Sequence, residues 1–600
     1  MSKHSFRVLA ISIALGFWYA TASAQLKPAP AKPELPIPAN ALFAVQIRGI
    51  GTAREKLEKF VTSVAPDRAK GLLEGLTNFL TEAMTGRDAA AIDAAGTVFA
   101  VVHDFDLKAM TATYSLMLPC KDYKLFRTKF LTVAERKSLT SAGDLVDELE
   151  FQNRPAFAID LTKSGYVAIA FDKPTAEFLS EKYPRLKVAD LGEAGASVFL
   201  GTDLAVFVNL REVHERYGKA LNSYRLLLAG LLRNGGLGVI PKLDKRQLAV
   251  ARLAVDGLFQ ALEDGQAIAL GVAFDDAGVT LRADVSFRPE TDTAKLLAEE
   301  KPRKLEQLLE LPANQTTFTA GAWSPRVGSF ANRLAPEYTP QPDDDRAWAA
   351  AEKFADLSAK TVWCSASSGV GSGLQATTPP DPAALASAHL KLLKNLAAGS
   401  AYKNLPLKES PTIKEGEQQH AGFTLSRVVL KVDFEAATAN IADETVREAA
   451  IQSMKRIVQE TTTIWFGHDG RRYVEITSVD WDAARGFLDT YREKKIPLGQ
   501  DPDLLELRKR LPAEATQIAV VEVRKGLVGL SSYSRAVIGA MPAFPGLEIP
   551  EIKTVPPGRD TFAGAALVLR PGGIGAVVVV PMSSAKVAAN ALMPPTPKAP

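Results

Sequence analysis

Two strand-like segments joined by a short turn and followed at once by a helix-like segment occur six times in this sequence. This repeated order constrains the fold more than any other feature, because alternating apolar residues indicate strands and apolar residues three or four apart indicate helices. The hairpins are expected at Thr97–Val102 with Thr111–Leu118, Ala156–Leu161 with Tyr166–Phe171, Ala267–Phe274 with Val279–Phe287, Lys360–Ser365 with Gly373–Thr378, Thr461–Phe466 with Arg472–Thr477, and Phe562–Leu569 with Ile574–Pro581.

The turns and helix starts support this assignment chemically. Asp469-Gly470 is a strong two-residue turn signal, because glycine accepts a positive φ without steric cost. Residues that cap helix amino termini follow five of the hairpins. The expected caps are Asp122, Asp172, Asp381, Asp480, and Ser583 or Ser584.

A further strand and helix often precede the hairpin. Leu311-Pro312-Ala313 and Leu511-Pro512-Ala513 open two such segments, and Ile37-Pro38-Ala39 is a near match. The implied module is β-α-β-β-α and spans about 90 to 110 residues, too irregular for a short-period solenoid. Divergent duplication within the chain explains the order, and chance similarity of ordinary α+β elements is the alternative.

The periodicity of the strands predicts which faces are buried. In Val279–Phe287 the odd-numbered residues are apolar, whereas Thr280, Arg282, Asp284 and Ser286 form the other face. In Arg472–Ser478 we expect Val474 and Ile476 inside and Glu475 and Thr477 outside. Strict alternation is typical of a sheet with one face on a core and one face in water. The helices would then cover one side only.

The predicted fold class is therefore α+β, with tandem divergent β-α-β-β-α modules and antiparallel sheets whose helices pack on one face. The 600 residues are enough for several domains. The expected boundaries are 1–24 signal peptide, 25–39 Pro-rich spacer, 40–190 first domain (one full and one reduced module), 191–310 second, 311–419 third, 420–510 fourth, 511–592 fifth, and 593–600 disordered tail.

The amino terminus predicts export. Lys3 and Arg7 precede the apolar stretch Val8–Ala20, which is too short for a comfortable bilayer span, and Ala22-Ser23-Ala24 follows as a small-x-small cleavage pattern. We expect cleavage before Gln25 and a periplasmic or secreted protein. A buried first helix and an uncleaved amino-terminal anchor are the alternatives, and no other stretch qualifies as a membrane span.

The charge balance argues against a nucleic-acid partner. The chain has 71 Lys and Arg against 68 Asp and Glu, and removal of residues 1–24 would lower its formal net charge from +3 to +1. Such a chain lacks the positive field that binders of polyanions use.

No pattern of residues selects a catalytic or metal site. The histidines His103, His214, His389, His420 and His468 are scattered, and neither His-Glu-x-x-His nor Cys-x-x-Cys occurs. His103-Asp104-Phe105-Asp106 and His468-Asp469 fall where two hairpins should turn, so a turn is favoured over a metal cluster. We therefore assign no catalytic, cofactor-binding or metal-binding residue and no cofactor.

Other polar or aromatic motifs have structural explanations. Gly369-Val370-Gly371-Ser372-Gly373 lies between two strands and predicts a hairpin loop, not a phosphate loop. Gly235-Gly236-Leu237-Gly238 predicts a linker, and Asp343-Asp344-Asp345 suits a helix amino terminus. The tryptophans are expected as core anchors; they are Trp323, Trp348, Trp363, Trp465 and Trp481.

The two cysteines, Cys120 and Cys364, leave two possibilities open. Export would permit a disulfide between them, and two buried thiols are the alternative. Sequence cannot decide, because the pairing depends on the distance between their Cα atoms.

The Leu-Pro-Ala openings, the export signal and the hairpin–helix units together resemble a class of large secreted bacterial proteins of unknown function. The resemblance implies no catalytic residues. We expect a non-catalytic exported protein that binds an unknown protein, an envelope component or a ligand held between modules. The alternatives are an exported hydrolase, which clustering of His103, His468 and acidic residues would favour, and a hydrophobic-ligand carrier, which needs an apolar cavity between sheet and helices.

Overall fold

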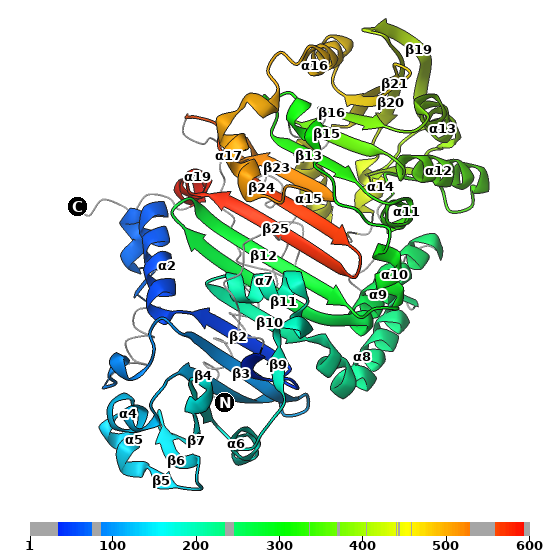
Figure 1. Cartoon of the computed structure of the whole chain (residues 1–600). Helices are drawn as coiled ribbons and strands as arrows, with labels where there is room; N and C mark the ends of the chain where they lie inside the picture. Colours follow the sequence, from blue (N-terminus) through cyan, green and yellow to red (C-terminus); the bar gives the residue numbers. More distant parts are fainter. Residues whose placement is uncertain are drawn as a thin grey trace.

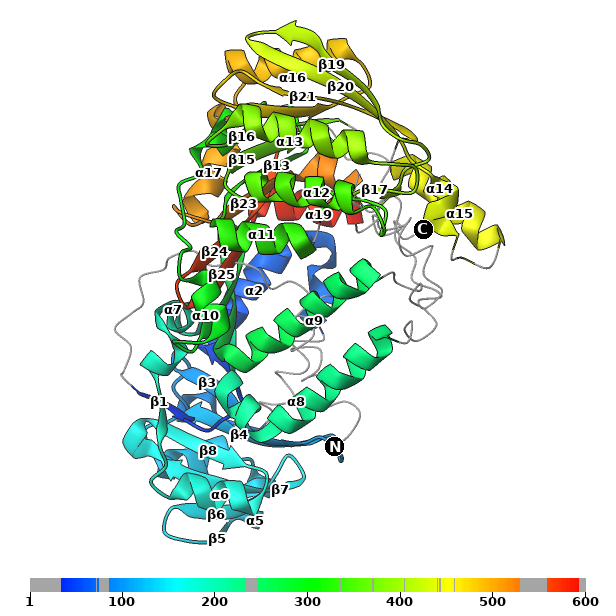
Figure 2. The ribbon, with the colours of Figure 1, turned by 90° about the vertical axis from the view of Figure 1, so that its right-hand side faces the viewer.

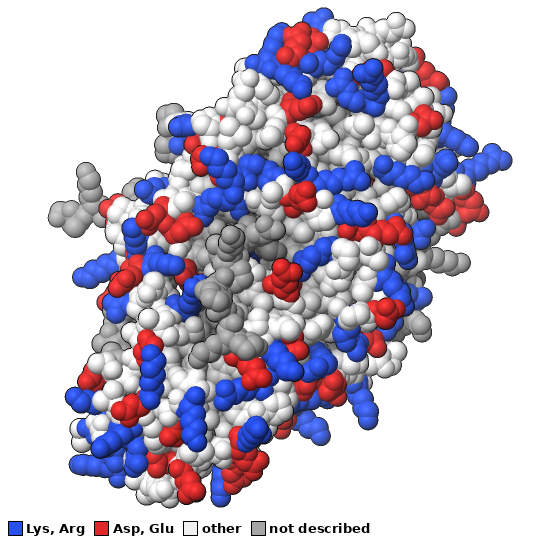
Figure 3. Space-filling model, viewed as in Figure 1, with Lys and Arg blue, Asp and Glu red and all other residues white. Residues whose placement is uncertain are grey.

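The structure is a computed structural model that describes residues 34–71, 73–74, 86–233, 245–334, 336–368, 372–403, 405–439, 441, 444–457, 459–528 and 558–592. It is a mixed helix and strand protein with large antiparallel sheets, as the α+β class predicted (Figure 1). Both signs of charge are interspersed over the face shown in Figure 3.

Within the described ranges, one sheet of twenty strands runs through the molecule. Its strands are β2 (Phe43–Arg48), β3 (Thr97–Asp106), β4 (Thr111–Pro119), β5 (Thr140–Ser141), β6 (Val146–Phe151), β7 (Arg154–Leu161), β8 (Tyr166–Ala170), β10 (Leu204–Asn209), β11 (Gly265–Asp275), β12 (Gly278–Phe287), β13 (Thr317–Ala322), β15 (Val362–Ser367), β16 (Gly373–Thr378), β19 (Thr412–His420), β20 (Phe423–Lys431), β21 (Thr461–His468), β22 (Tyr473–Thr477), β23 (Gln517–Glu522), β24 (Phe562–Arg570) and β25 (Gly573–Pro581).

The longer helices are α2 (Ile50–Val64), α6 (Lys173–Ser180), α7 (Glu193–Gly201), α8 (Leu210–Arg233), α9 (Lys245–Asp264), α11 (Pro325–Leu334), α12 (Asp345–Ser358), α13 (Pro382–Asn395), α15 (Glu444–Ile457), α16 (Trp481–Glu493), α17 (Pro502–Arg510) and α19 (Met582–Leu592). Shorter helices are α4 (Tyr123–Leu125), η3 (Phe126–Phe130), α5 (Val133–Ser138), α10 (Asp292–Leu297), η6 (Glu306–Glu310), α14 (Phe434–Thr438) and η7 (Leu498–Gln500). In the part of the chain that the structure describes, none of the helices combines the length and the apolar character that crossing a membrane requires.

The pairing of the strands gives the order β5-β6-β7-β8-β4-β3-β2-β10-β11-β12-β25-β24-β23-β13-β15-β16-β22-β21-β20-β19. All six predicted hairpins are present, and the strand before each hairpin pairs with the first hairpin strand. Neighbouring units meet through like strands, for example β4 with β8, β12 with β25, and β16 with β22. The segments expected as separate domains therefore share one sheet.

Four of the predicted helix caps are confirmed. Asp122, Asp172, Asp381 and Asp480 each accept a hydrogen bond from a backbone N–H three residues later. The expected serine cap is wrong, because α19 already begins at Met582 and the Ser584 hydroxyl donates to the carbonyl oxygen of Phe562 (2.8 Å).

The expectation that helices pack on one face is wrong. On β22, Val474 and Ile476 belong to a core that α16 and α17 cover, whereas Tyr473 lies on the opposite face, in a core with α13. Figure 2 shows α7 and α17 on the left of the strands and α8, α9 and α15 on the right. The alternation in the sequence reveals that the two faces of a strand differ in polarity. It does not reveal that a second layer of helices covers the polar face.

The polar face of β12 shows the same error. Arg282 and Asp284, which alternation placed in water, are 8% and 1% exposed, and Thr280 and Ser286 are also buried. On this face α7 packs against β12, and its Gly195 lies close to the Asp284 carboxyl. The Arg570 guanidinium donates to Asp284 (2.5 Å), which offsets part of the cost of burying that carboxylate.

Part of the segment expected as a spacer is folded. The strand β1 (Glu34–Pro38) pairs with β9 (Arg185–Lys187), and Leu35 and Ile37 are buried. Residues 34–39 therefore belong to the folded protein. The expected signal peptide, its cleavage site, the rest of the spacer and the carboxy-terminal tail lie outside the described residues.

Both cysteines are free thiols in the structure. Cys120 follows β4 and Cys364 lies on β15, and both are buried. Of the two possibilities that the sequence left open, the structure has the buried thiols and not the disulfide.

Candidate functional site

A cavity of about 1240 Å³ lies between the sheet and the helix layer that the sequence did not predict. Its lining residues come from β15, β16 and β22 on one side and from α9, α11 and α12 on the other. The short strands β14 (Tyr338–Thr339), β17 (Ala401–Tyr402) and β18 (Leu405–Pro406) complete the wall. The exposed residues Asp345 and Glu352 also line it, so solvent reaches its rim.

A chain of hydrogen-bonding groups forms the floor of this cavity. His389 of α13 is fully buried, with its Nδ1 2.5 Å from the Tyr473 hydroxyl and its Nε2 2.9 Å from the Tyr338 hydroxyl. The Glu475 carboxyl lies within hydrogen-bonding reach of Tyr473, and its Oε2 is 3.9 Å from His389 Nδ1. Tyr473 and Glu475 are two residues apart on β22, so both side chains leave the same face of the sheet.

Burial controls the protonation of this cluster. It raises the pKa of Glu475 to about 8, an effect that nearby Glu337 reinforces and Lys403 opposes. It also lowers the pKa of His389 to about 3 and raises the pKa of Tyr473 well above its ordinary value. At neutral pH the floor is therefore mainly uncharged, with a protonated carboxyl that can donate or, once ionised, attract a cation.

The walls of the cavity are rich in aromatic groups. Trp348 and Trp363 line it, and the Trp348 indole N–H donates to the Gln341 carbonyl oxygen (2.9 Å). Trp323 Nε1 and Thr377 Oγ1 are buried polar atoms of lining residues that find no hydrogen-bond partner among the residues described. A ligand with both an apolar body and polar groups would suit these walls.

The charged residues of the lining are mostly acidic. Among the lining residues that the structure describes, the single guanidinium belongs to Arg333. The carboxyl groups are those of Glu337, Asp345, Glu352, Asp356 and Glu475. Aromatic rings together with carboxylates are the groups that recognise organic cations, through cation–π attraction and direct charge pairing.

The histidines considered as metal or catalytic candidates are far apart. His103 lies on β3 and His468 on β21, twelve positions apart in the strand order, or roughly 60 Å measured along the sheet at about 4.8 Å per strand. The clustering that would favour a hydrolase does not occur. No group of three or more possible metal ligands is found among the residues described.

The first candidate turn begins later than predicted. His103 lies within β3, and its Nε2 is 2.8 Å from the Ser115 hydroxyl. Burial lowers the pKa of His103 to about 4. The turn starts after Asp106, whose carboxylate accepts from the backbone N–H groups of Lys108 and Ala109.

The second candidate turn lies where the sequence predicted it. The Asp469 carboxylate accepts from the backbone N–H groups of Arg471 and Arg472. The aspartate therefore has the turn-forming role that the sequence favoured over metal binding.

The other motifs have mixed outcomes. Asp344 caps α12, as the run of three aspartates predicted, and Trp465 is a buried core residue. Trp323, Trp348 and Trp363 instead border the cavity. The linker at 235–238 and the centre of the loop at 369–371 lie outside the described residues.

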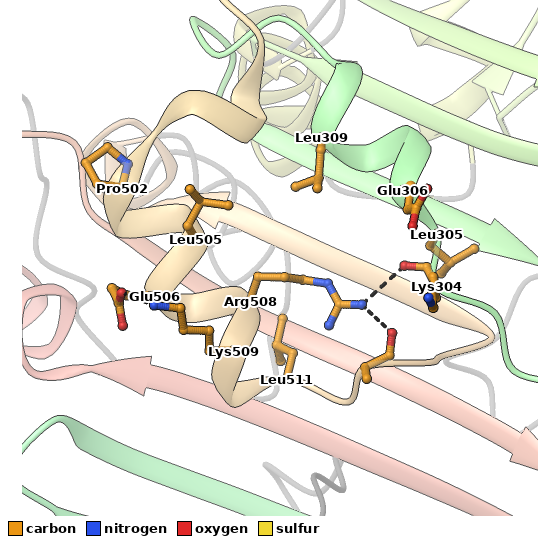
Figure 4. A pocket seen from close by; sticks show the side chains of 11 residues that line it. Lys304, Leu305, Glu306, Leu309, Pro502, Leu505, Glu506, Arg508, Lys509 and Leu511 are labelled. Carbon is orange, nitrogen blue, oxygen red and sulfur yellow. Dashed lines mark hydrogen bonds and ion pairs between the residues drawn. The ribbon is translucent and has the colours of Figure 1, made fainter.

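A second pocket of about 520 Å³ lies between η6 and α17. The Arg508 guanidinium crosses it and donates to the carbonyl oxygens of Ala513 (2.6 Å) and Lys304 (3.2 Å), as Figure 4 shows. It also donates to the carbonyl oxygen of Pro512. Because these bonds hold the Leu511-Pro512-Ala513 opening against the preceding segment, we assign this arginine a structural role.

Sequence reasoning missed the cluster around Glu475. It placed that side chain in water and regarded His389 as one of several scattered histidines. The partners of His389 lie 51 and 84 residues away in the chain, so no local spacing could have joined them. Comparison with known proteins gives no further guide, since no family model, curated protein or solved structure matches the chain.

Proposed function

We propose that this is an exported, non-catalytic binding protein that holds an amphipathic molecule with a positively charged group in the cavity over β16 and β22. The observation that supports this best is the combination of aromatic walls with five carboxyl groups against one guanidinium in a single cavity. The amphipathic ligand would place its apolar body against the tryptophans and its cation near Glu475, whose carboxyl would release its proton when the cation binds.

The position of the cavity favours a ligand-binding role over a sheet-surface role. Helices cover both faces of β22, so this strand does not present an open surface to a protein partner. A carrier of hydrophobic ligands requires a space between sheet and helices, and this cavity provides one. Its lining residues come from three of the expected domains. A ligand held between modules therefore agrees with the geometry better than an envelope protein bound along the sheet.

The hydrolase alternative receives no support from this site. A general base needs a free nitrogen, and both ring nitrogens of His389 face tyrosine hydroxyls within 3 Å. Its low pKa also makes it a poor proton acceptor near neutral pH.

Calorimetric titration of the purified chain tests the proposal. The probes are dodecyltrimethylammonium, dodecyl sulfate and dodecyl maltoside, each below its micelle concentration. We expect measurable binding of the ammonium probe alone, weakened at least tenfold by Glu475→Gln. The matched control is Glu506→Gln in the second pocket. Equal binding of all three probes, or equal effects of the two variants, would contradict the proposal.

We also propose that the six strand–hairpin units arose by divergent duplication. Pro38, Pro312 and Pro512 each precede by five residues the strand that opens a unit. In addition, the segments that contain or follow these prolines each form an antiparallel β-bridge with a segment far away in the chain. The bridged pairs are Pro38 with Arg185, Pro312 with Pro497, and Ala515 with Arg303. An experimental structure in which the units fail to superpose would refute the duplication.

Export is part of the same proposal. We propose cleavage before Gln25 and a periplasmic or secreted location, as in the large secreted bacterial proteins that the sequence resembles. Amino-terminal sequencing of the protein from its native host tests it: a mature chain beginning at Gln25 supports export, and an intact Met1 in the cytosolic fraction contradicts it.

A further inference from the structure

Two neighbouring strands place a carboxamide beside the buried carboxyl of Glu475. Gln375 of β16 lies directly opposite Glu475 of β22 in the strand register, and both residues line the cavity. Directly opposed residues share one face of the sheet, with their Cβ atoms roughly 5 Å apart. Gln375 is exposed whereas Glu475 is buried, so the carboxamide borders the open side of the cavity next to this carboxyl.

The carboxamide of Gln375 is available to a ligand. The row of opposed residues continues from Gln375 to Ser365 of β15 and Thr319 of β13, whose hydroxyl groups lie 2.7 Å apart and bond to each other. The Gln375 side chain forms no hydrogen bond with another residue in the part of the chain that the structure describes. It therefore offers one acceptor oxygen and two N–H donors to the cavity.

The surroundings of Glu475 favour a small cation that can donate hydrogen bonds. Among the residues described, the basic side chain within 4 Å of its carboxyl is that of His389, which burial keeps neutral near pH 7. A primary ammonium has three N–H donors and forms charge-assisted hydrogen bonds of about 2.7–2.9 Å. It can donate to the Glu475 carboxylate and to the Gln375 carbonyl oxygen together.

A quaternary ammonium fits the same two groups less well. Its methyl groups donate no hydrogen bond and hold its nitrogen roughly 4 Å or more from any oxygen. Because the attraction between opposite charges falls with distance, the buried carboxylate would gain less from this cation. The Gln375 carbonyl oxygen would gain no hydrogen bond from it.

The aromatic rings that could surround a quaternary ammonium are used elsewhere. Trp363 of β15 is two strands from Glu475, or roughly 10 Å. A Cβ on Gly321 of β13 would lie 2.7 Å from the Trp363 indole, so this ring covers β13, on the side away from β22. Phe354 stacks on His389 with ring centroids 4.6 Å apart, which occupies one of its faces. These rings suit the chain of a ligand better than a cage around its cation.

On the basis of the proposed function, we propose that the charged group of the ligand is a primary ammonium and that Gln375 selects it over a quaternary ammonium. The ligand class is then a protonated long-chain amine. Its nitrogen lies between Gln375 and Glu475, and its chain runs along the aromatic walls.

Calorimetric titration of the full chain at pH 7 with two matched probes tests this selection. Dodecylammonium and dodecyltrimethylammonium, each below its micelle concentration, have the same chain and one positive charge, since an alkylamine has a pKa of about 10. We expect the parent chain to bind dodecylammonium at least tenfold more tightly. Gln375→Met keeps the length of the side chain without its hydrogen bonds. It should remove most of this preference and change the affinity for dodecyltrimethylammonium less than twofold.

Gln419→Met is the matched control. Gln419 is an exposed glutamine on β19 that does not belong to the described lining of the cavity, so its replacement should leave both affinities unchanged. Circular dichroism checks that each variant is folded. Equal or tighter binding of dodecyltrimethylammonium by the parent chain, or a preference that persists in Gln375→Met, would overturn the head-group assignment and leave the amphipathic cation of the proposed function in place. Absence of binding by both probes would contradict the proposed function itself, and this assignment with it.

Discussion

Replacing Glu475 with glutamine should make the protein more stable at alkaline pH. The carboxyl is 7% exposed, and its pKa rises from an ordinary 4.5 to about 8 in the folded chain. Between these values the native state keeps a proton that the unfolded chain has released. Stability contributed by this group is therefore complete below pH 4.5 and is lost as the pH rises through 8. Glutamine has the same shape and no such dependence.

The magnitude follows from the size of the pKa shift. Each pKa unit of the shift corresponds to about 1.4 kcal/mol in the free energy of unfolding. The whole shift from 4.5 to about 8 therefore amounts to ~5 kcal/mol. If the free energy of unfolding falls by about 2–3 kcal/mol per molar urea, this free-energy difference separates the urea midpoints of the two proteins by about 2 M. The two proteins should have nearly equal midpoints at pH 5, and the Glu475→Gln midpoint should exceed that of the parent chain increasingly up to pH 8.5.

Urea unfolding followed by tryptophan fluorescence measures this difference, since Trp363 lines the cavity and Trp465 lies on β21, which pairs with β22. Subtracting the two proteins at each pH removes the contribution of every other titrating group. Glu352→Gln, at the exposed rim, is the control and should give a difference that does not vary with pH. A pH-independent difference for Glu475→Gln would refute the argument that this carboxyl is buried and protonated.

Three other outcomes follow from the packing. His389→Phe should lower stability by roughly 2–5 kcal/mol in urea unfolding, because it leaves two buried tyrosine hydroxyls without their partner; no loss would contradict the network. Gly467→Ala should lower the free energy of unfolding by about 1–3 kcal/mol, because a Cβ there would overlap the Thr424 carbonyl oxygen. A thermal midpoint equal to that of the parent chain would show that this contact between strands is looser than described. Cys120 and Cys364 should resist a thiol reagent in the native chain and give two reactive thiols after unfolding without reductant, whereas none would indicate a disulfide.

The sequence predicts the hairpins and helix starts well because their causes are local. Asp122 and Asp480 cap helices through bonds to N–H groups three residues away, so the signal and its effect lie within one turn. Boundaries are less certain, as β3 shows by continuing to Asp106, beyond the Val102 at which we expected it to end. A strand ends where its pairing ends, which depends on its neighbour as well as on its own residues.

The candidate site could not be predicted in the same way. The alternation around Val474, Glu475 and Ile476 is real, and it correctly separates two faces. It carries no information about α12 and α13, whose residues come about 80 to 130 positions earlier and cover the polar face. A long-range layer of helices thus changes a side chain expected in water into a buried acid.

The sheet order has a similar cause. The pairing of β12 with β25 joins Gly278–Ser286 to residues almost 300 positions later. No local pattern specifies which outer strand of one unit pairs with which outer strand of another. The repeated modules therefore predicted separate domains and could not reveal one continuous sheet.

The claim that the cavity over β16 and β22 holds an amphipathic cation is tested most directly by an experimental structure with a probe bound. Crystals soaked with a bromine-labelled alkyltrimethylammonium should give an anomalous bromine peak against Trp348 and Trp363, with the ammonium group on the Glu475 side. A probe bound only elsewhere, or a cavity already filled by the chain itself, would contradict the account.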